Sequence, residues 1–200
     1  LNIRILPPDI NTGESMFVQQ KDRTIVYGLS AIKNVGSDVV DAIVLERWKS
    51  GKFKSLTDFV ERMIGYVNRQ TLESLIKSGA FDFTGNSRSQ LMAIMDSTLE
   101  EASKYKKTIK DGQLLLFTEQ RPIIDNVPNI QEYPNKILLT VEKEVLGLYL
   151  SGHPLQAIKS YVDNNSTVKA SDFVTEDEEG NDVETEKPFL YDGQKVSLVC

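Results

Sequence analysis

The stretch Gly28-Leu-Ser-Ala-Ile-Lys-Asn-Val-Gly36, followed by a helical pattern from Ser37 to Arg47, decides the fold of this 200-residue chain. It predicts a short helix, a tight turn and a second helix. We expect Gly36 to adopt a positive φ in the turn and Ser37 to be the N-cap of the second helix. Such a turn points backbone N–H groups outward at a helix N-terminus, where a phosphate oxygen can bind.

The residues around this turn are therefore candidates for contacting a nucleic-acid backbone. Phosphate contacts position a protein on a duplex but carry no sequence information. An ordinary helical hairpin, in which the glycine only reverses the chain, fits the local pattern as well. The candidate residues of this first hairpin are Lys33, Asn34, Val35, Gly36 and Ser37.

A second hairpin follows in the sequence. Ser55 opens a helix as part of a capping box with Asp58, and Asn68 is the expected N-cap of the next helix, which ends before Gly79. Two paired hairpins can hold both strands of a duplex across its minor groove, with Asn68 and Arg69 facing phosphates in the second hairpin. The alternative is one compact helical bundle in which only the first hairpin contacts another molecule.

The remaining pattern is mainly helical, with short strands at the N-terminal end. Short strands are expected within residues 3–10, 15–18 and 24–27, and helices over 87–107 and 135–150. Leu91, Met92, Met95 and Leu99 form the expected buried stripe of the long helix, and Ser151-Gly152 the end of the later one. The lysines at 104, 106, 107 and 110 indicate a solvated face, with a specific binding site as the alternative. The single histidine, His153, is expected in a capping or packing role.

A short apolar run lies between the long helix and a proline-containing stretch. Exposed apolar residues in a linker are costly unless another surface binds them. We expect a peptide that docks in a groove of another protein, with two apolar side chains in a pocket and a glutamine at its rim. A strand or plug that folds back on its own domain is the alternative. The residues are Gln113, Leu114, Leu115, Leu116 and Phe117, of which Leu116 and Phe117 are the expected anchors.

Charge is distributed unevenly around a net charge of −6. Residues 1–110 carry 16 Lys and Arg against 13 Asp and Glu, whereas residues 111–200 carry 7 against 16. This asymmetry indicates a module that faces a polyanion, joined to something else. Because the basic part is only mildly basic, affinity for nucleic acid is expected to be weak and salt-sensitive.

Composition excludes several classes of protein. The only cysteine, Cys200, excludes an internal disulfide framework and fits a reducing cytoplasm. The sequence contains neither a long apolar run nor a signal-peptide pattern, so we expect no membrane contact. The chain begins at Leu1 and ends within a strand-like stretch at 196–199, from which we expect it to be a piece of a longer polypeptide.

Three segments together resemble the alpha subunit of bacterial DNA polymerase III, of the DnaE type. They are Val26-Tyr-Gly-Leu-Ser-Ala-Ile-Lys-Asn-Val-Gly36, Asn68-Arg-Gln-Thr-Leu-Glu-Ser-Leu-Ile-Lys-Ser-Gly-Ala-Phe-Asp82 and Lys143-Glu-Val-Leu-Gly-Leu-Tyr-Leu-Ser-Gly-His-Pro-Leu155. The resemblance covers nearly the whole chain. Its last two segments are long and unusual, which makes it specific.

The resemblance implies a mainly α fold, a tandem helix-hairpin-helix domain with short N-terminal strands, then a helical linker region and the first strand of a truncated OB-fold. The implied segments are 1–30, the end of the fingers domain; 31–110, the duplex-binding hairpins and long helix; 111–134, a linker with the clamp-binding motif; 135–165, a helical connector; and 166–200, an acidic loop and the start of the OB-fold.

The resemblance also implies a function. The chain would bind the backbone of double-stranded DNA and, through residues 113–117, the beta sliding clamp, beside other subunits of the polymerase III holoenzyme in the cytoplasm. The parent would be a DNA-directed DNA polymerase whose palm carboxylates hold Mg²⁺. This fragment holds no catalytic residue, metal ligand or cofactor and should not polymerise DNA alone. A clamp-tethered helix-hairpin-helix module of a DNA-repair protein is the alternative, and a purely structural helical module is a third reading.

Overall fold

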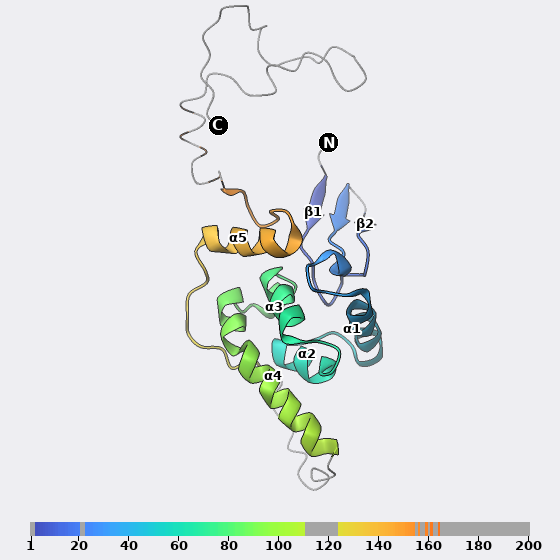
Figure 1. Cartoon of the computed structure of the whole chain (residues 1–200). Helices are drawn as coiled ribbons and strands as arrows, with labels where there is room; N and C mark the ends of the chain where they lie inside the picture. The colour runs from blue at the N-terminus through green and yellow to red at the C-terminus, as the bar shows by residue number, and fades with distance from the viewer. Residues whose placement is uncertain are drawn as a thin grey trace, which may run out of the picture. The chain divides into compact units, whose positions relative to one another are not determined.

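The computed structural model describes residues 3–20, 23–110 and 124–154, together with positions 156, 159, 161 and 164. The chain divides into two compact units, Leu1–His153 and Pro154–Cys200. The first unit contains three short strands and five α-helices, as the sequence predicts for a mainly α fold (Figure 1). The pentapeptide 113–117, the acidic stretch and the expected OB-fold strand lie outside the described residues.

A small sheet forms at the N-terminal end of the first unit. Its strands β1 (Arg4–Leu6), β2 (Val18–Gln20) and β3 (Thr24–Val26) have the order β1-β3-β2. Strand β1 runs parallel to β3 and β2 runs antiparallel to it. The prolines at 7 and 8 follow β1 directly and end it, because proline has no backbone N–H for strand pairing.

The second strand begins later than predicted. Residues 15–17 are outside β2 because this part of the chain pairs with the segment that opens the first hairpin. The backbone N–H of Leu29 donates to the carbonyl of Glu14 at 2.8 Å, and the Ser15 and Ser30 hydroxyls lie 2.7 Å apart. A β-carbon at Gly28 would lie 2.7 Å from the backbone of Met16, so glycine allows the two segments to approach this closely.

The first hairpin consists of η1 (Leu29–Ala31), a turn and α1 (Ser37–Ser50). Two predictions about its turn are wrong. The residue with a positive φ is Asn34, at 64°, whereas Gly36 has φ −75° and ψ 155°. Gly36 is also the N-cap of α1, and Ser37 is the first residue inside the helix. Asparagine tolerates the left-handed region better than other non-glycine residues, so the turn does not need a glycine there.

The second hairpin consists of α2 (Leu56–Met63), a turn and α3 (Arg69–Lys77), as predicted. The Ser55 hydroxyl accepts a hydrogen bond from the backbone N–H of Asp58 at 3.0 Å. The capping box is not reciprocal, because the Asp58 carboxylate accepts from the backbone N–H of Lys54 instead, at 2.8 Å. Asn68 caps α3 through the N–H of Thr71, and Gly79 follows the helix with φ +84°. Both of these predictions are confirmed.

The later helices cover the hairpins. Helix α4 (Arg88–Lys110) buries Leu91 and Met95 of its predicted stripe, and Met92 and Leu99 are partly buried against the same core. Helix α5 (Asn135–Leu146) lies beside α3 (Figure 1). The prediction that this helix reaches residue 150 is wrong, because Gly147 ends it with φ 78° in a left-handed C-terminal cap.

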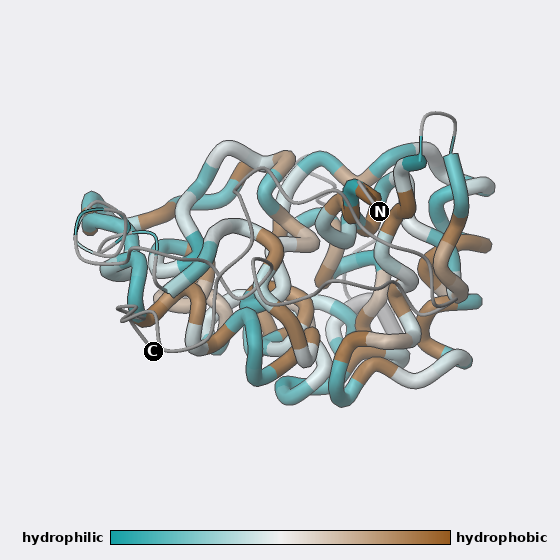
Figure 2. The backbone as a smooth tube through the Cα atoms, turned by 90° about the horizontal axis from the view of Figure 1, so that it is seen from above, coloured by the Kyte–Doolittle hydropathy of each residue, from teal (hydrophilic) through white to brown (hydrophobic). Residues whose placement is uncertain are grey.

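One apolar core joins the five α-helices and the first turn. The rings of Phe53, Phe59 and Phe81 stack edge to face in its centre, with successive centroids 5.0 and 5.1 Å apart. Ile10 and Tyr27 from the N-terminal segment and Val145 from α5 belong to the same core. The tube in Figure 2 shows apolar and polar stretches alternating along the chain.

Candidate nucleic-acid interface

The first hairpin presents backbone donors at the start of α1. The residues Gly36, Ser37 and Asp38 are exposed. Their backbone N–H groups make no hydrogen bond to any other residue that the structure describes. The next two N–H groups, of Val39 and Val40, donate to the Gly36 carbonyl at 3.1 and 3.2 Å. Free, outward N–H groups at a helix N-terminus are a geometry that binds phosphate oxygens.

The second hairpin repeats this arrangement at the start of α3. Its turn places Gly65 at φ +101° and buries Val67, and Asn68 satisfies the N–H of Thr71 with its side chain. Arg69 and Gln70, the first two residues of the helix, are exposed. Within the part of the chain that the structure covers, their N–H groups have no acceptor. The second hairpin therefore also offers two free donors.

Asn34 connects the two hairpins directly. Its side-chain amide donates to the Ser74 hydroxyl at 3.1 Å, and its backbone carbonyl accepts from the Thr71 hydroxyl at 2.9 Å. Thr71 is the third residue of α3. The turn of the first hairpin therefore lies against the first turn of α3, the second helix of the second hairpin. The structure thus brings predicted residues from both hairpins, 33–37 and 68–69, into one region.

The predicted residues differ in what they can contact. Lys33, Asn34, Gly36 and Ser37 are exposed, as are Asn68 and Arg69. Val35 is only 5% exposed, and its N–H donates to the Ile32 carbonyl at 3.1 Å. Val35 therefore anchors the turn in the core, and its neighbours present the polar groups.

The two basic residues among the predicted DNA contacts, Lys33 and Arg69, are held by carboxylates. Arg69 donates to both oxygens of Asp96, at 2.7 and 3.1 Å, and to Glu73 at 3.1 Å. These bonds from Arg69 lower the pKa of Asp96, and the same carboxylate raises the pKa of Arg69. Lys33 pairs more loosely with Glu144, at 3.8 Å.

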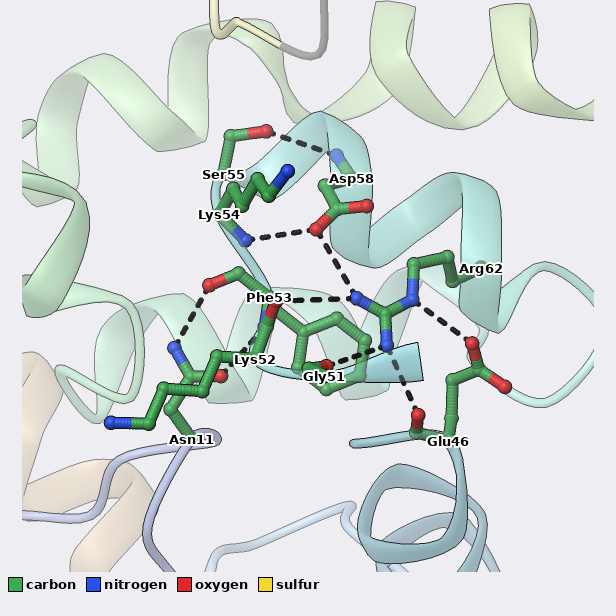
Figure 3. Close-up of polar contacts among 9 residues, drawn as sticks. All are labelled: Asn11, Glu46, Gly51, Lys52, Phe53, Lys54, Ser55, Asp58 and Arg62. Atoms are coloured by element: carbon green, nitrogen blue, oxygen red, sulfur yellow. Dashed lines mark hydrogen bonds and ion pairs between the residues drawn. The ribbon is translucent and has the colours of Figure 1, made fainter. Parts of the chain in front are cut away.

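Arg62 fixes the loop between α1 and α2, on which the relative orientation of the two hairpins depends (Figure 3). Its guanidinium donates to the Glu46 side chain at 3.0 Å and to the carbonyls of Glu46 and Gly51 at 3.1 and 2.9 Å. It also lies 4.1 Å above the centre of the Phe53 ring. Arg62 thus donates hydrogen bonds to backbone carbonyls at the end of α1, where the helix itself offers no further N–H partners.

Sequence reasoning missed two contacts to the turns. The Lys106 ammonium, assigned to a solvated face, donates to the Ile64 carbonyl at 2.5 Å in the second turn. The backbone N–H of Lys33 donates to the Val145 carbonyl of α5 at 2.9 Å. Each contact joins residues more than forty positions apart, so no local pattern could indicate it.

Across 3–20, 23–110 and 124–154, no three His, Cys, Asp or Glu side chains are grouped closely enough to hold a metal ion. None of the helices described has the length and apolar character needed to cross a membrane. His153 packs edge-on against the Tyr149 ring with centroids 6.2 Å apart, which agrees with the predicted packing role.

Comparison with known proteins agrees with this geometry. The helix-hairpin-helix motif family matches residues 2–91. The chain is 42% identical to the DNA polymerase III subunit alpha of Borreliella burgdorferi over 84% of its own length and 15% of that protein. For the subunits of Escherichia coli K12 and Deinococcus radiodurans the identities are 40% over 81% of the chain and 41% over 78%.

The chain spans only 12–15% of the length of these curated relatives. The similarity nevertheless covers about four-fifths of the chain. This chain therefore contains a helix-hairpin-helix domain and belongs to the bacterial DNA polymerase III alpha-subunit family, as the homologue of one segment of that subunit.

Proposed function

We propose that the two hairpins hold duplex DNA by its backbone, without reading its sequence. The observation that carries this proposal is the pair of helix N-termini with free N–H donors, joined through Asn34 and Thr71. Donors of this kind contact phosphates rather than base edges. The match to the helix-hairpin-helix motif family supports the same function.

The test is the binding of the chain to fluorescently labelled duplexes at several salt concentrations. Each neutralised phosphate adds about −0.9 to the slope of log affinity against log salt, so a handful of contacts gives a slope of roughly −3 to −5. Duplexes of unrelated sequence should bind equally. A strong preference for one sequence, or an affinity independent of salt, would contradict the proposal.

We further propose that residues 113–117 tether the polymerase to the beta sliding clamp. The described residues on either side of this peptide are the end of α4 and a segment that is bonded to α2. Lys110 ends α4, and the Asp125 carboxylate accepts from the N–H groups of Leu56 and Thr57 at 2.9 and 2.8 Å. A peptide between two fixed points loses less freedom on binding than one on a free tail.

The whole parent protein is, on this proposal, a template-directed DNA polymerase whose duplex product passes over the two hairpins. It would act in the cytoplasm with the other subunits of the holoenzyme. Its Mg²⁺-dependent chemistry would belong to a palm domain elsewhere in the parent. In this reading the chain contributes to processivity, because a duplex held at the hairpins and at the clamp dissociates less often.

A further inference from the structure

Six charged residues of alternating sign form a continuous chain of ion pairs between the two hairpins, called here the ion-pair chain. Its members come from the first turn and from α3, α4 and α5. The successive nitrogen–oxygen distances are 3.8 Å for Lys33–Glu144, 3.8 Å for Glu144–Lys77, 2.8 Å for Lys77–Glu73, 3.1 Å for Glu73–Arg69 and 2.7 Å for Arg69–Asp96.

The first and last cations of the ion-pair chain, Lys33 and Arg69, are the proposed DNA contacts. Lys33 lies in the turn of the first hairpin, and Arg69 is the first residue of α3, the second helix of the second hairpin. The side chains of Lys33 and Glu144 are 57% and 51% exposed, and those of Arg69 and Asp96 are 59% and 61% exposed. A phosphate can therefore reach both cations and replace both carboxylates.

A carboxylate and a phosphate offer a cation the same kind of acceptor. The two-point contact between Arg69 and Asp96 has the geometry with which arginine also binds phosphate. Exposed ion pairs contribute little to folding stability. The larger effect of Glu144 and Asp96 is consequently on binding, because each competes with the DNA backbone for a cation that would otherwise attract it.

We propose that Glu144 and Asp96 limit the affinity of the two hairpins for DNA by occupying Lys33 and Arg69 until a phosphate displaces them. The inference rests on the proposed function and adds the residues that set its strength. As a duplex bound in this way moves, Lys33 and Arg69 exchange one acceptor, a phosphate or a carboxylate, for another. The hairpins then hold the duplex without fixing it in one register.

The test compares Glu144→Gln and Asp96→Asn with the unsubstituted chain in duplex binding. Each is expected to bind roughly three- to tenfold more tightly at low salt, and to steepen the salt slope by about 0.9, because one more cation becomes available to phosphate. The matched control is Glu100→Gln, which removes the same charge from α4 at a carboxylate that pairs with Lys104 at 3.6 Å. In Lys33→Ala/Glu144→Gln the gain should disappear, since Lys33 is absent and Lys77, the other cation beside Glu144, stays paired with Glu73 at 2.8 Å.

The possible outcomes separate this inference from the function on which it rests. If the unsubstituted chain binds no duplex at low salt, the proposed function fails. If it binds, and Glu144→Gln and Asp96→Asn bind no more tightly than Glu100→Gln, only the competition inference fails. Weaker binding together with a lower melting temperature would show that the ion-pair chain braces the fold, and would overturn the inference as well.

Discussion

Asn34 supplies both the backbone conformation of the first turn and its connection to α3. Its φ of 64° is unusual for a residue with a side chain, and its amide donates to Ser74 forty residues away. Gly36, which the sequence marks as the special position, has an ordinary φ of −75°, and a β-carbon built there meets no atom within 4 Å. The conformational demand of the turn therefore lies two residues before the glycine.

Replacing Asn34 should therefore cost more than replacing Gly36. Asn34→Ala is expected to lower the free energy of unfolding by about 1–3 kcal/mol, from left-handed strain and a lost hydrogen bond. Gly36→Ala should change it by less than about 0.5 kcal/mol. Urea unfolding measures both, and Asn34→Gly separates the causes, because it keeps the backbone conformation and loses only the side-chain bond. A greater loss for Gly36→Ala than for Asn34→Ala would refute this account of the turn.

Side chains cap the N-termini of α2, α3 and α4, and the capping residues are either local or distant in the sequence. Helix α3 uses a local cap, Asn68, and α2 combines the local Ser55 with a distant carboxylate, Asp125. Helix α4 combines the local Ser87, whose hydroxyl accepts from the N–H of Gln90 at 3.2 Å, with the distant Glu132, whose oxygens accept from the N–H groups of Arg88 and Ser89 at 2.7 and 3.0 Å. The stretch between α4 and α5 thus caps two helices that precede it in the sequence, instead of acting only as a linker.

Glu132 should make stability depend on pH. Burial by itself would raise its pKa, but hydrogen bonds from the backbone N–H groups of Ser89, Tyr133 and Arg88, with the charge of Arg88, lower the pKa below its ordinary value of 4.5. The folded state then binds fewer protons than the unfolded state. The stabilisation is complete above pH 4.5 and is lost as the pH falls through the lower folded-state pKa.

Urea unfolding between pH 7 and pH 3 measures this effect. Glu132→Gln should be less stable than the unsubstituted chain at neutral pH, by about 0.5–2 kcal/mol as for other lost caps. The difference should shrink as the pH falls below 4.5. Glu101→Gln, an exposed change on α4, is the control and should follow the unsubstituted chain throughout. A difference that stays constant with pH would contradict a role for the ionised carboxylate.

At the scale of the first unit, buried charge joins α3, α4 and α5. Arg88 is 7% exposed and donates to the Lys77 carbonyl at 3.0 Å and to Asp82 at 2.9 Å, and its Nη1 lies 3.7 Å from Oε1 of the fully buried Glu142. The other Glu142 oxygen accepts from the N–H groups of Leu150 and Ser151. Through these contacts Leu150 and Ser151, which follow α5, are fixed to the same body as the hairpins.

The proposed clamp contact is tested on the whole chain. Leu116→Ala/Phe117→Ala should abolish binding to a bacterial beta sliding clamp in calorimetry, whereas the unsubstituted chain should bind with a Kd on the order of 1 μM. The two side chains are the expected anchors, since burying each contributes roughly 1.5–3 kcal/mol. Ile124→Ala is the matched control and should bind normally. It truncates an apolar side chain that is close to residues 113–117 in the sequence and is 74% exposed. If the double variant bound the clamp as tightly as the unsubstituted chain, residues 113–117 would pack within their own domain instead of binding the clamp.

The sequence by itself determined the features that depend on neighbouring residues. The caps at Ser55 and Asn68, the glycine after α3 and the buried stripe of α4 follow from local hydrogen bonding and helical periodicity, and the family follows from long specific segments. Only the tertiary structure decided which residue takes the positive φ, because Ser74 stabilises Asn34 from across the fold. The same holds for the caps from Asp125 and Glu132 and for the ion-pair chain, since their members are adjacent only after the helices have packed.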